Sequence, residues 1–171
     1  MTAVRIRDCT GRAEYPRLVA IWRSAVEATH DFLTAADRDA IESQLATAYF
    51  PSVRLTVAEI DGEPVGFAGT AGEALEMLFV HAQVHGRGVG SALLKHAIAE
   101  RGIRLVDVNE QNEQAIAFYV RRGFVITGRS ECDDAGRPYP LLHMARPMEP
   151  PRAVESRSAT GFGSHCYAPE K

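Results

Sequence analysis

The sequence predicts a mixed α/β (α+β) fold, with a mostly antiparallel sheet, helices on both faces and one central β-α-β unit. Two helical patterns precede two strand-like runs that are joined by Asp61-Gly62. A further strand leads through the glycine-rich stretch "HGRGVG" at 85–90 into a helix and then another strand. Because tight turns join antiparallel strands and a helical crossover joins parallel ones, these runs together predict a mixed sheet.

The N-terminal part is predicted to contain one strand and two helices. "AVRIRD" at 3–8 alternates apolar and polar residues, as a half-buried strand does. The helix after it has an apolar stripe at three- and four-residue spacing, formed by Leu18, Ile21, Trp22, Ala25 and Val26. Thr34 and Asp37 have the spacing of an N-cap and its N3 partner. They open a second helix, whose predicted core residues are Ile41, Leu45 and Ala48.

The remaining elements follow in order. "SVRLTVAEI" and "PVGFAGTA" form a hairpin around Asp61-Gly62, and "LEMLFV" at 75–80 is an apolar strand. The next helix buries Leu93, Leu94, Ala97 and Ile98 and ends at Gly102. "IRLVDV" at 103–108 is the parallel partner strand, and the helix "NEQAIAFYVRR" stops at Gly123. "FVITGRS" and "LLHMA" are two last strands around the turn "DDAGRP".

Composition limits the class of protein. The chain has 171 residues, of which 46% are hydrophobic, so we expect one domain over residues 1–147. Residues 148–171 are rich in Pro, Gly and Ser without periodicity, and we expect a flexible tail there. A net charge of −3 argues against nucleic acid as a partner. The sequence shows neither a signal peptide nor a membrane-length apolar run, which predicts a cytoplasmic protein.

The three cysteines, Cys9, Cys132 and Cys166, have no metal-ligand spacing, and we expect reduced thiols and no metal site.

The glycine loop predicts an anion site. Glycine allows a ligand to approach the backbone, and the helix that starts there adds a partial positive charge. A P-loop is excluded because Ser91-Ala92 follows Gly90, where Lys and Ser or Thr are needed. A dinucleotide fingerprint is a distant second: Asp107 lies at a suitable distance, but Ser91 replaces the third glycine.

Two motifs resemble a known family. "HGRGVG" is similar to the acyl-CoA pyrophosphate loop of the GCN5-related N-acetyltransferases (GNAT), and "NEQAIAFYVRRGF" at 112–124 is similar to their second signature. The resemblance covers residues 3 to about 146. The runs "VNEQNEQAIAFY" and "GRSECDDAGRPYPLL" resemble the small bacterial YjaB-type acetyltransferases within it. His85 departs from the pattern, since the family usually has Arg or Gln there.

The resemblance implies that "LEMLFV" and "IRLVDV" splay apart around the pantetheine arm of acetyl-CoA. The cofactor-binding residues that it implies are Leu78, Phe79, Val80, His85, Gly86, Arg87, Gly88, Val89, Gly90, Ser91, Asn112, Ala115 and Phe118. It also implies that the Val80 amide meets the thioester carbonyl and that Tyr119 is the general acid. Asp107 or Glu76 could be the base, although both could be structural acids and water could relay the proton instead.

The implied acceptor site lies between the first two helices and the last hairpin. Its candidate residues could form a polar pocket with aromatic walls: His30, Asp31, Phe32, Tyr139 and His143. Structural roles are the alternative: His30 could cap the first helix, Phe32 could connect it to the second, and His143 could simply lie in its strand. We therefore expect an N-acetyltransferase that moves acetyl from acetyl-CoA directly to the amine of a small molecule or peptide, as a monomer or homodimer. The alternative is a non-catalytic acyl-CoA sensor of the same fold; transfer through a cysteine is a weaker hypothesis.

Overall fold

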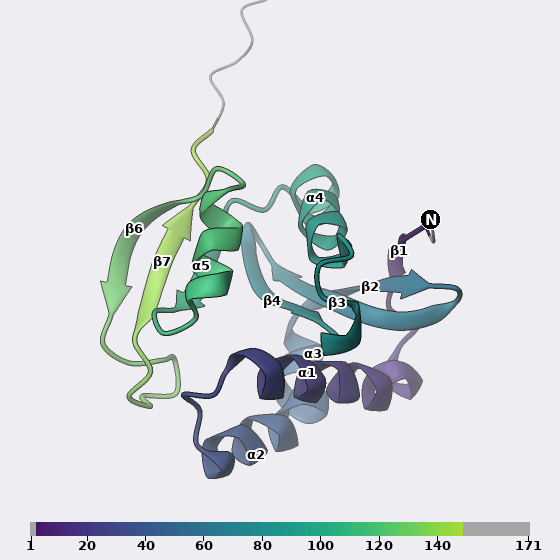
Figure 1. The fold of residues 1–171 in the computed structure, drawn as a ribbon, viewed down its shortest axis with the longest axis horizontal. Coiled ribbons are helices and arrows are strands. Elements are labelled where there is room, and N and C mark those ends of the chain that lie inside the picture. The colour runs from purple at the N-terminus through teal and green to yellow at the C-terminus, as the bar shows by residue number, and fades with distance from the viewer. Residues whose placement is uncertain (1–2, 149–171) are drawn as a thin grey trace, which may run out of the picture.

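The computed structural model describes residues 3–148 (Figure 1). These residues form one seven-stranded sheet in the order β1-β2-β3-β4-β5-β7-β6. Only the β4–β5 pair is parallel. The strands are β1 (Arg5–Asp8), β2 (Arg54–Ile60), β3 (Glu63–Ala71), β4 (Ala74–Val80), β5 (Leu105–Asn109), β6 (Val125–Ser130) and β7 (Leu141–Ala145). The predicted tail, 148–171, lies outside the described residues except for Met148.

Five α-helices connect the strands within the described residues. They are α1 (Tyr15–Thr29), α2 (Ala35–Gln44), α3 (Phe50–Ser52), α4 (Val89–Arg101) and α5 (Glu113–Val120). Figure 1 shows α1 and α2 together on one side of the sheet, and α4 on the other. The mixed sheet, its central β4-α4-β5 unit and the helices on both faces confirm the predicted fold class.

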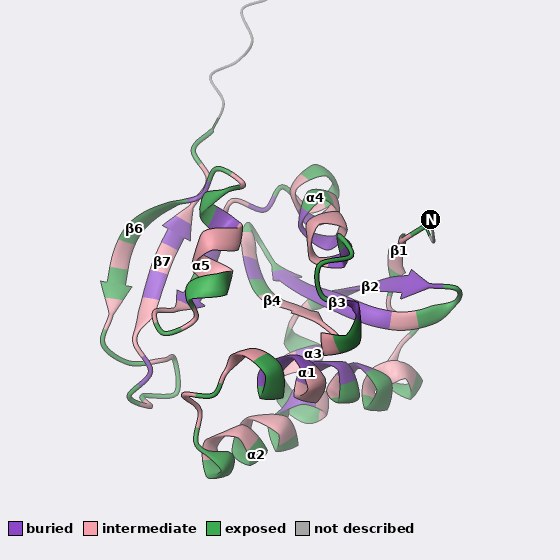
Figure 2. Cartoon of the chain, in the orientation of Figure 1, coloured by how far each residue is buried: buried purple, intermediate pink, exposed green. Residues whose placement is uncertain are grey.

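Neighbouring residues of β3 show how the two faces are covered. Gly66 faces α4, since a Cβ added there would lie 3.0 Å from Val89 and 3.2 Å from Leu93. Phe67 faces the other side, where its ring packs edge-on against Phe50 with centroids 5.5 Å apart. Alternation along the strand thus supplies a separate core to each face. Figure 2 shows β2 and β3 buried along most of their length between these cores.

The second helix begins as predicted and ends differently. The Thr34 hydroxyl accepts a hydrogen bond from the Asp37 amide at 3.1 Å, which confirms the cap. After α2, residues Leu45–Tyr49 form a π-helical turn. Leu45 is buried, but the prediction that Ala48 faces the core is wrong: Ala48 is exposed, and Phe50 is buried in its place. The wider turn rotates the following residues around the helix axis relative to α-helical spacing.

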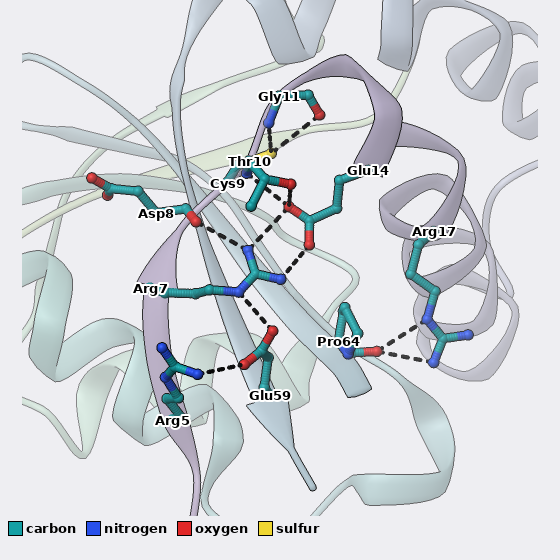
Figure 3. A network of polar contacts seen from close by, with 10 residues as sticks. All are labelled: Arg5, Arg7, Asp8, Cys9, Thr10, Gly11, Glu14, Arg17, Glu59 and Pro64. Carbon is teal, nitrogen blue, oxygen red and sulfur yellow. Dashed lines mark hydrogen bonds and ion pairs between the residues drawn. The ribbon is translucent and has the colours of Figure 1, made fainter. Parts of the chain in front are cut away.

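A polar network fixes β1 to its neighbours (Figure 3). The Arg7 guanidinium donates to Glu59 of β2 at 2.6 Å and to Glu14, which precedes α1. The bonds from Arg7 lower the pKa of the Glu14 carboxyl to about 2. Arg17 of α1 donates to the Pro64 carbonyl at 2.9 and 3.1 Å. These contacts attach the start of the chain to β2 and β3.

The parallel strands β4 and β5 diverge after a short contact. They pair only at Ala74 with Leu105 and at Leu75 with Val106. The next residue of each strand is a carboxylate, Glu76 on β4 and Asp107 on β5. From these two residues onward β4 and β5 no longer pair, whereas β5 continues its antiparallel ladder with β7 on its other edge. The opening that begins between Glu76 and Asp107 is called the fork. The predicted splay of the two strands is present in the structure.

Candidate active site

Two cavities lie beside the opening between β4 and β5. The first, of about 770 Å³, is lined by the end of β4, the glycine loop, the start of α4 and the helix α5. The second, of about 580 Å³, is lined by β4, β5, the β6–β7 connection and residues of α1 and α2. Phe79 lines both. Two molecules that enter from different sides can therefore approach each other at the end of β4.

The glycine loop presents free backbone amides to the first cavity. Gly86 and Gly88 have φ values of +77° and +81°, which side chains other than glycine's adopt only with strain. The first intrahelical bond after the loop runs from the Ala92 amide to the Gly88 carbonyl at 3.0 Å. The amides of Val89 and Gly90 therefore have no carbonyl acceptor within the helix, and both residues line the cavity. This is the geometry that binds a diphosphate.

His85, where the family pattern has Arg or Gln, binds the protein itself. Its Nε2 lies 2.8 Å from the carbonyl oxygen of Val80. A carbonyl can only accept, so Nε2 donates this bond. The ring therefore fastens the loop to the end of β4, and the backbone amides remain for the anion.

Arg122 is a residue of this cavity that the sequence analysis missed. Its guanidinium lies 3.6 Å from the centre of the Phe118 ring and donates to the Phe118 carbonyl at 2.8 Å. It also donates to the hydroxyl of Ser91, in the first turn of α4. The four-residue spacing from Phe118 to Arg122 is the signal that could have indicated this contact. The Arg122 guanidinium thus adds a positive charge beside the backbone amides that are free to bind an anion.

The amide of Val80 faces the gap between the strands. Antiparallel partners alternate between pairs that exchange hydrogen bonds and pairs that do not. The His81 amide donates to the Val65 carbonyl at 2.8 Å. The adjacent pair, Gly66 and Val80, is therefore one that does not exchange hydrogen bonds. The Val80 amide therefore points away from β3 toward β5, which has already diverged. It is available to a carbonyl oxygen of a ligand in the gap.

Tyr119 and Asn112 are placed by α5. The Asn112 side chain accepts from the Ala115 amide at 3.0 Å and caps the helix. Tyr119 lines the first cavity but is only 6% exposed, with its ring packed edge-on against Phe118 and Phe124. This burial raises the pKa of its hydroxyl above the ordinary value of 10. The hydroxyl therefore holds its proton at neutral pH, as a general acid must.

Carboxylates gather in the second cavity. Glu76 and Asp107 occupy the fork, and Asp133 and Asp134 of the β6–β7 connection complete the lining together with Arg137. Burial, together with repulsion from Asp107 and Asp134, raises the pKa of Glu76. Arg137 compensates Asp133 at 3.1 Å, whereas Glu76 and Asp134 have no ion pair within the described residues. An acid-lined cavity with the apolar side chains of Trp22 and Phe79 in its wall suits an aliphatic ammonium group.

The predicted cofactor residues gather in the first cavity. All of them line it except Arg87. The five predicted acceptor residues do not share one cavity, although the ring of Phe32 contacts those of His30 and Tyr139, with centroids 5.2 and 6.2 Å apart. His30 lies in the first cavity, where burial lowers the pKa of its ring to about 4 and so keeps it neutral. The other four line neither cavity.

Contacts among the protein's own groups account for the positions of these residues. The Tyr139 hydroxyl donates to Asp37, and its ring contacts Phe32 at 6.2 Å, so this tyrosine joins the final hairpin to the start of α2. The His143 ring is hydrogen-bonded to Asp107, which lies between it and the second cavity. Asp31 is exposed in the turn after α1.

No group of three or more potential ligand side chains is arranged to hold a metal ion within residues 3–148. None of the helices in this range combines the length and apolar character needed to cross a bilayer.

Comparison with known proteins agrees with this geometry. Residues 51–126 match the Acetyltransferase (GNAT) domain. The peptidyl-lysine N-acetyltransferase YjaB of Salmonella typhimurium is 47% identical over 135 residues, which cover 78% of this chain and 92% of that protein. The solution structure of apo-form YjaB from Escherichia coli is 44% identical, with a TM-score of 0.77 over 84% of this chain and 97% of that one.

A more distant neighbour shares the fold alone. The PaiA N-acetyltransferase of Thermoplasma acidophilum, solved in complex with coenzyme A, is 16% identical with a TM-score of 0.67 and covers 84% of this chain and 99% of that one. Free amides at a glycine loop, a forked pair of central strands and a relative with 47% identity over nearly its whole length lead to one assignment. The chain belongs to the GNAT family of acetyltransferases.

Proposed function

We propose that this enzyme transfers acetyl from acetyl-CoA directly to the ε-amine of a lysine side chain in a peptide or protein. The observation that carries the proposal is the acid-lined second cavity, which meets the cofactor cavity at Phe79. Lysine combines a cationic end with a long apolar stem, and both parts have a counterpart in this lining. The name of the relative with 47% identity, a peptidyl-lysine N-acetyltransferase, supports the same acceptor.

The first cavity fits acetyl-CoA. The amides of the loop and of the first turn of α4 would bind the pyrophosphate, and the Arg122 guanidinium would add a positive charge beside it. Leu78 and Val80, which do not bond to β3, would present backbone groups to the pantetheine amides along the open edge of β4. Gly90, which lines this cavity, would allow the ligand to approach its backbone closely, because it has no Cβ.

The proposed chemistry needs three groups of this chain. The Val80 amide would donate to the thioester oxygen as negative charge develops on it. Glu76 or Asp107 would accept a proton from the incoming ammonium, since only the free amine is a nucleophile. The Tyr119 hydroxyl would then protonate the departing sulfur.

Release of free CoA thiol, measured with a panel of amines, tests the acceptor. A peptide with one internal lysine and a blocked N-terminus should be acetylated, and mass spectrometry should place the acetyl group on that lysine. The same peptide with arginine in place of lysine is the matched control and should give no thiol above hydrolysis. If a peptide N-terminus or a small amine reacts and the internal lysine does not, the proposed acceptor is wrong.

A further inference from the structure

Asp107 is the first member of a chain of three side chains that crosses three neighbouring strands. Its Oδ1 lies 2.7 Å from Nδ1 of His143 on β7, and Nε2 of His143 lies 2.7 Å from the Ser130 hydroxyl on β6. Asp107 and His143 are direct cross-strand partners. Asp107 lines the second cavity, whereas His143 and Ser130 do not. The imidazole therefore contacts the acceptor site only through the carboxylate.

An irregularity in β6 makes this chain possible. Val125 and Ile126 pair with Ala145 and Met144, and the pairing then skips Thr127 so that Gly128 opposes His143. Without the extra residue, Thr127 would oppose His143, and Ser130 would face the other side of the sheet. The bulge thus brings both Gly128 and Ser130 to the face of the imidazole.

Gly128 leaves room for the ring. A Cβ added at Gly128 would already lie 3.4 Å from Cδ2 of His143, at the limit of ordinary contact. A side chain larger than that of alanine would add further atoms beside the ring. Register, bulge and glycine therefore act together on one side chain, His143.

The hydrogen bonds define the tautomer of the ring. An ionised carboxylate can only accept, so Nδ1 of His143 carries the proton that it donates to Asp107. In the neutral ring, Nε2 is then an acceptor, and the Ser130 hydroxyl donates to it. Asp107 therefore selects the tautomer, and the Ser130 hydroxyl, which can donate or accept, satisfies the nitrogen that is left over.

We propose that His143 is a positioning residue that holds Asp107 at the fork as the base of the transfer reaction. The proposal rests on the proposed acetyltransferase function and chooses between its two candidate bases. One N–H bond of the ammonium breaks, and its proton binds an Asp107 oxygen while the free amine attacks the thioester carbon. Asp107 then releases the proton to water, to which its side chain is 48% exposed. The C–N bond forms, the C–S bond of the thioester breaks, and Tyr119 donates its proton to the departing thiolate. A second proton, lost by the nitrogen after the attack, restores the Tyr119 hydroxyl.

Two substitutions of His143 test the proposal. His143→Leu removes the donor to Asp107, and we expect kcat for a lysine peptide to fall roughly ten- to hundred-fold, since a hydrogen bond to a charged group is lost. The KM for acetyl-CoA should remain unchanged. His143→Asn retains a donor near the position of Nδ1 and should restore most of the rate. Thr127→Ala is the matched control, because it removes a hydrogen bond to the His143 carbonyl at 3.2 Å and leaves the ring alone.

Equal losses in the Leu and Asn variants, or full activity in the Leu variant, would overturn the positioning role. Long-range ¹H–¹⁵N correlation spectra of the wild-type chain provide a readout that needs no turnover. We expect a neutral His143 ring protonated at Nδ1 in the wild type and, because Asp107 selects the tautomer, in Ser130→Ala as well; a neutral ring protonated at Nε2 in an active enzyme refutes only this inference. A wild-type enzyme that acetylates no lysine peptide refutes the proposed function instead.

Discussion

Gly88→Ala tests whether the loop amides bind the cofactor, because the chain contains a matched control for it. Gly88 and Gly62 both have φ of +81°, and a Cβ added at either would find no heavy atom within 4 Å. A left-handed residue with a side chain costs about 1–2 kcal/mol in either place. If φ stays positive in both, the two variants should therefore lose a similar amount of the free energy of unfolding.

The two variants should differ in cofactor affinity. Gly62 lies in the β2–β3 turn, whereas Gly88 precedes the first turn of α4, whose free amides line the cofactor cavity. If the backbone at position 88 relaxes toward negative φ, the neighbouring amides turn and one hydrogen bond to phosphate is lost. Such a bond contributes about 1.5–3 kcal/mol. The dissociation constant for acetyl-CoA should then rise roughly ten- to hundred-fold.

Isothermal titration with acetyl-CoA, next to urea unfolding of the same samples, measures both quantities. The expected result is a destabilisation of Gly88→Ala no greater than that of Gly62→Ala, and weakened binding in Gly88→Ala alone. If Gly88→Ala is destabilised less than Gly62→Ala, so that its backbone has relaxed, and still binds with wild-type affinity, the amides are not the phosphate site. If Gly62→Ala weakens binding as much, the effect is general.

Four further substitutions test other parts of the site and the fold. Tyr119→Phe should lower kcat by about 10²–10⁴-fold with unchanged affinity for acetyl-CoA, since it removes only the acid; an unaffected rate would contradict that role. Arg122→Leu should weaken cofactor binding in titration more than Arg121→Leu does, because only Arg122 bonds to the first turn of α4. Glu76→Gln should raise the free energy of unfolding at pH 7, since the folded pKa of Glu76 is raised and its ionisation opposes folding. This gain should shrink as the pH falls toward 4.5, and a loss of stability at pH 7 would refute it. Glu14→Gln should destabilise the protein at pH 7, and because the folded pKa of Glu14 is about 2, the difference from wild type should narrow between pH 4.5 and 2 in urea unfolding. A difference that does not change with pH would show that the charge of Glu14 is unimportant.

Local signals predicted the elements of this fold well because the physics behind them is local. Thr34 caps α2 through an amide three residues away, and Asp61-Gly62 supplies the two positive φ values of the hairpin turn. Gly102 ends α4 in the left-handed conformation. Each of these depends on a few adjacent dihedral angles, so a short stretch of sequence contains the necessary information.

Single-residue shifts in register could not be predicted in the same way. The π-helical turn that exposes Ala48 and the bulge at Thr127 each add one residue to a regular repeat. Their local sequences do not differ visibly from an ordinary helix or strand, because packing against distant elements decides them. Yet the bulge determines which β6 side chains reach His143. A shift of a single residue, which the sequence does not reveal, therefore changes which side chains face the core or the site.

The acceptor site shows a second limit of sequence reasoning. Alternation correctly placed Asp107 on one face of β5, with Val106 buried on the other. It could not show that the Tyr139 hydroxyl is already bound to Asp37, or that His30 faces the cofactor cavity. The Tyr139 bond depends on a partner about a hundred residues away in the sequence. The position of His30 depends on which of the two cavities the end of α1 borders.

The distribution of charge shows why this fold can bring an anion and a cation together. The net charge of −3 hides a separation of charge that only the structure makes visible. Arg121 and Arg122 line the cofactor cavity, whereas most of the charged groups of the second cavity are carboxylates. Because acetyl-CoA is anionic and lysine is cationic, each would be attracted to a different side of the fork. The sign of the local potential would then sort the two substrates before any specific contact forms, and salt should weaken the binding of both.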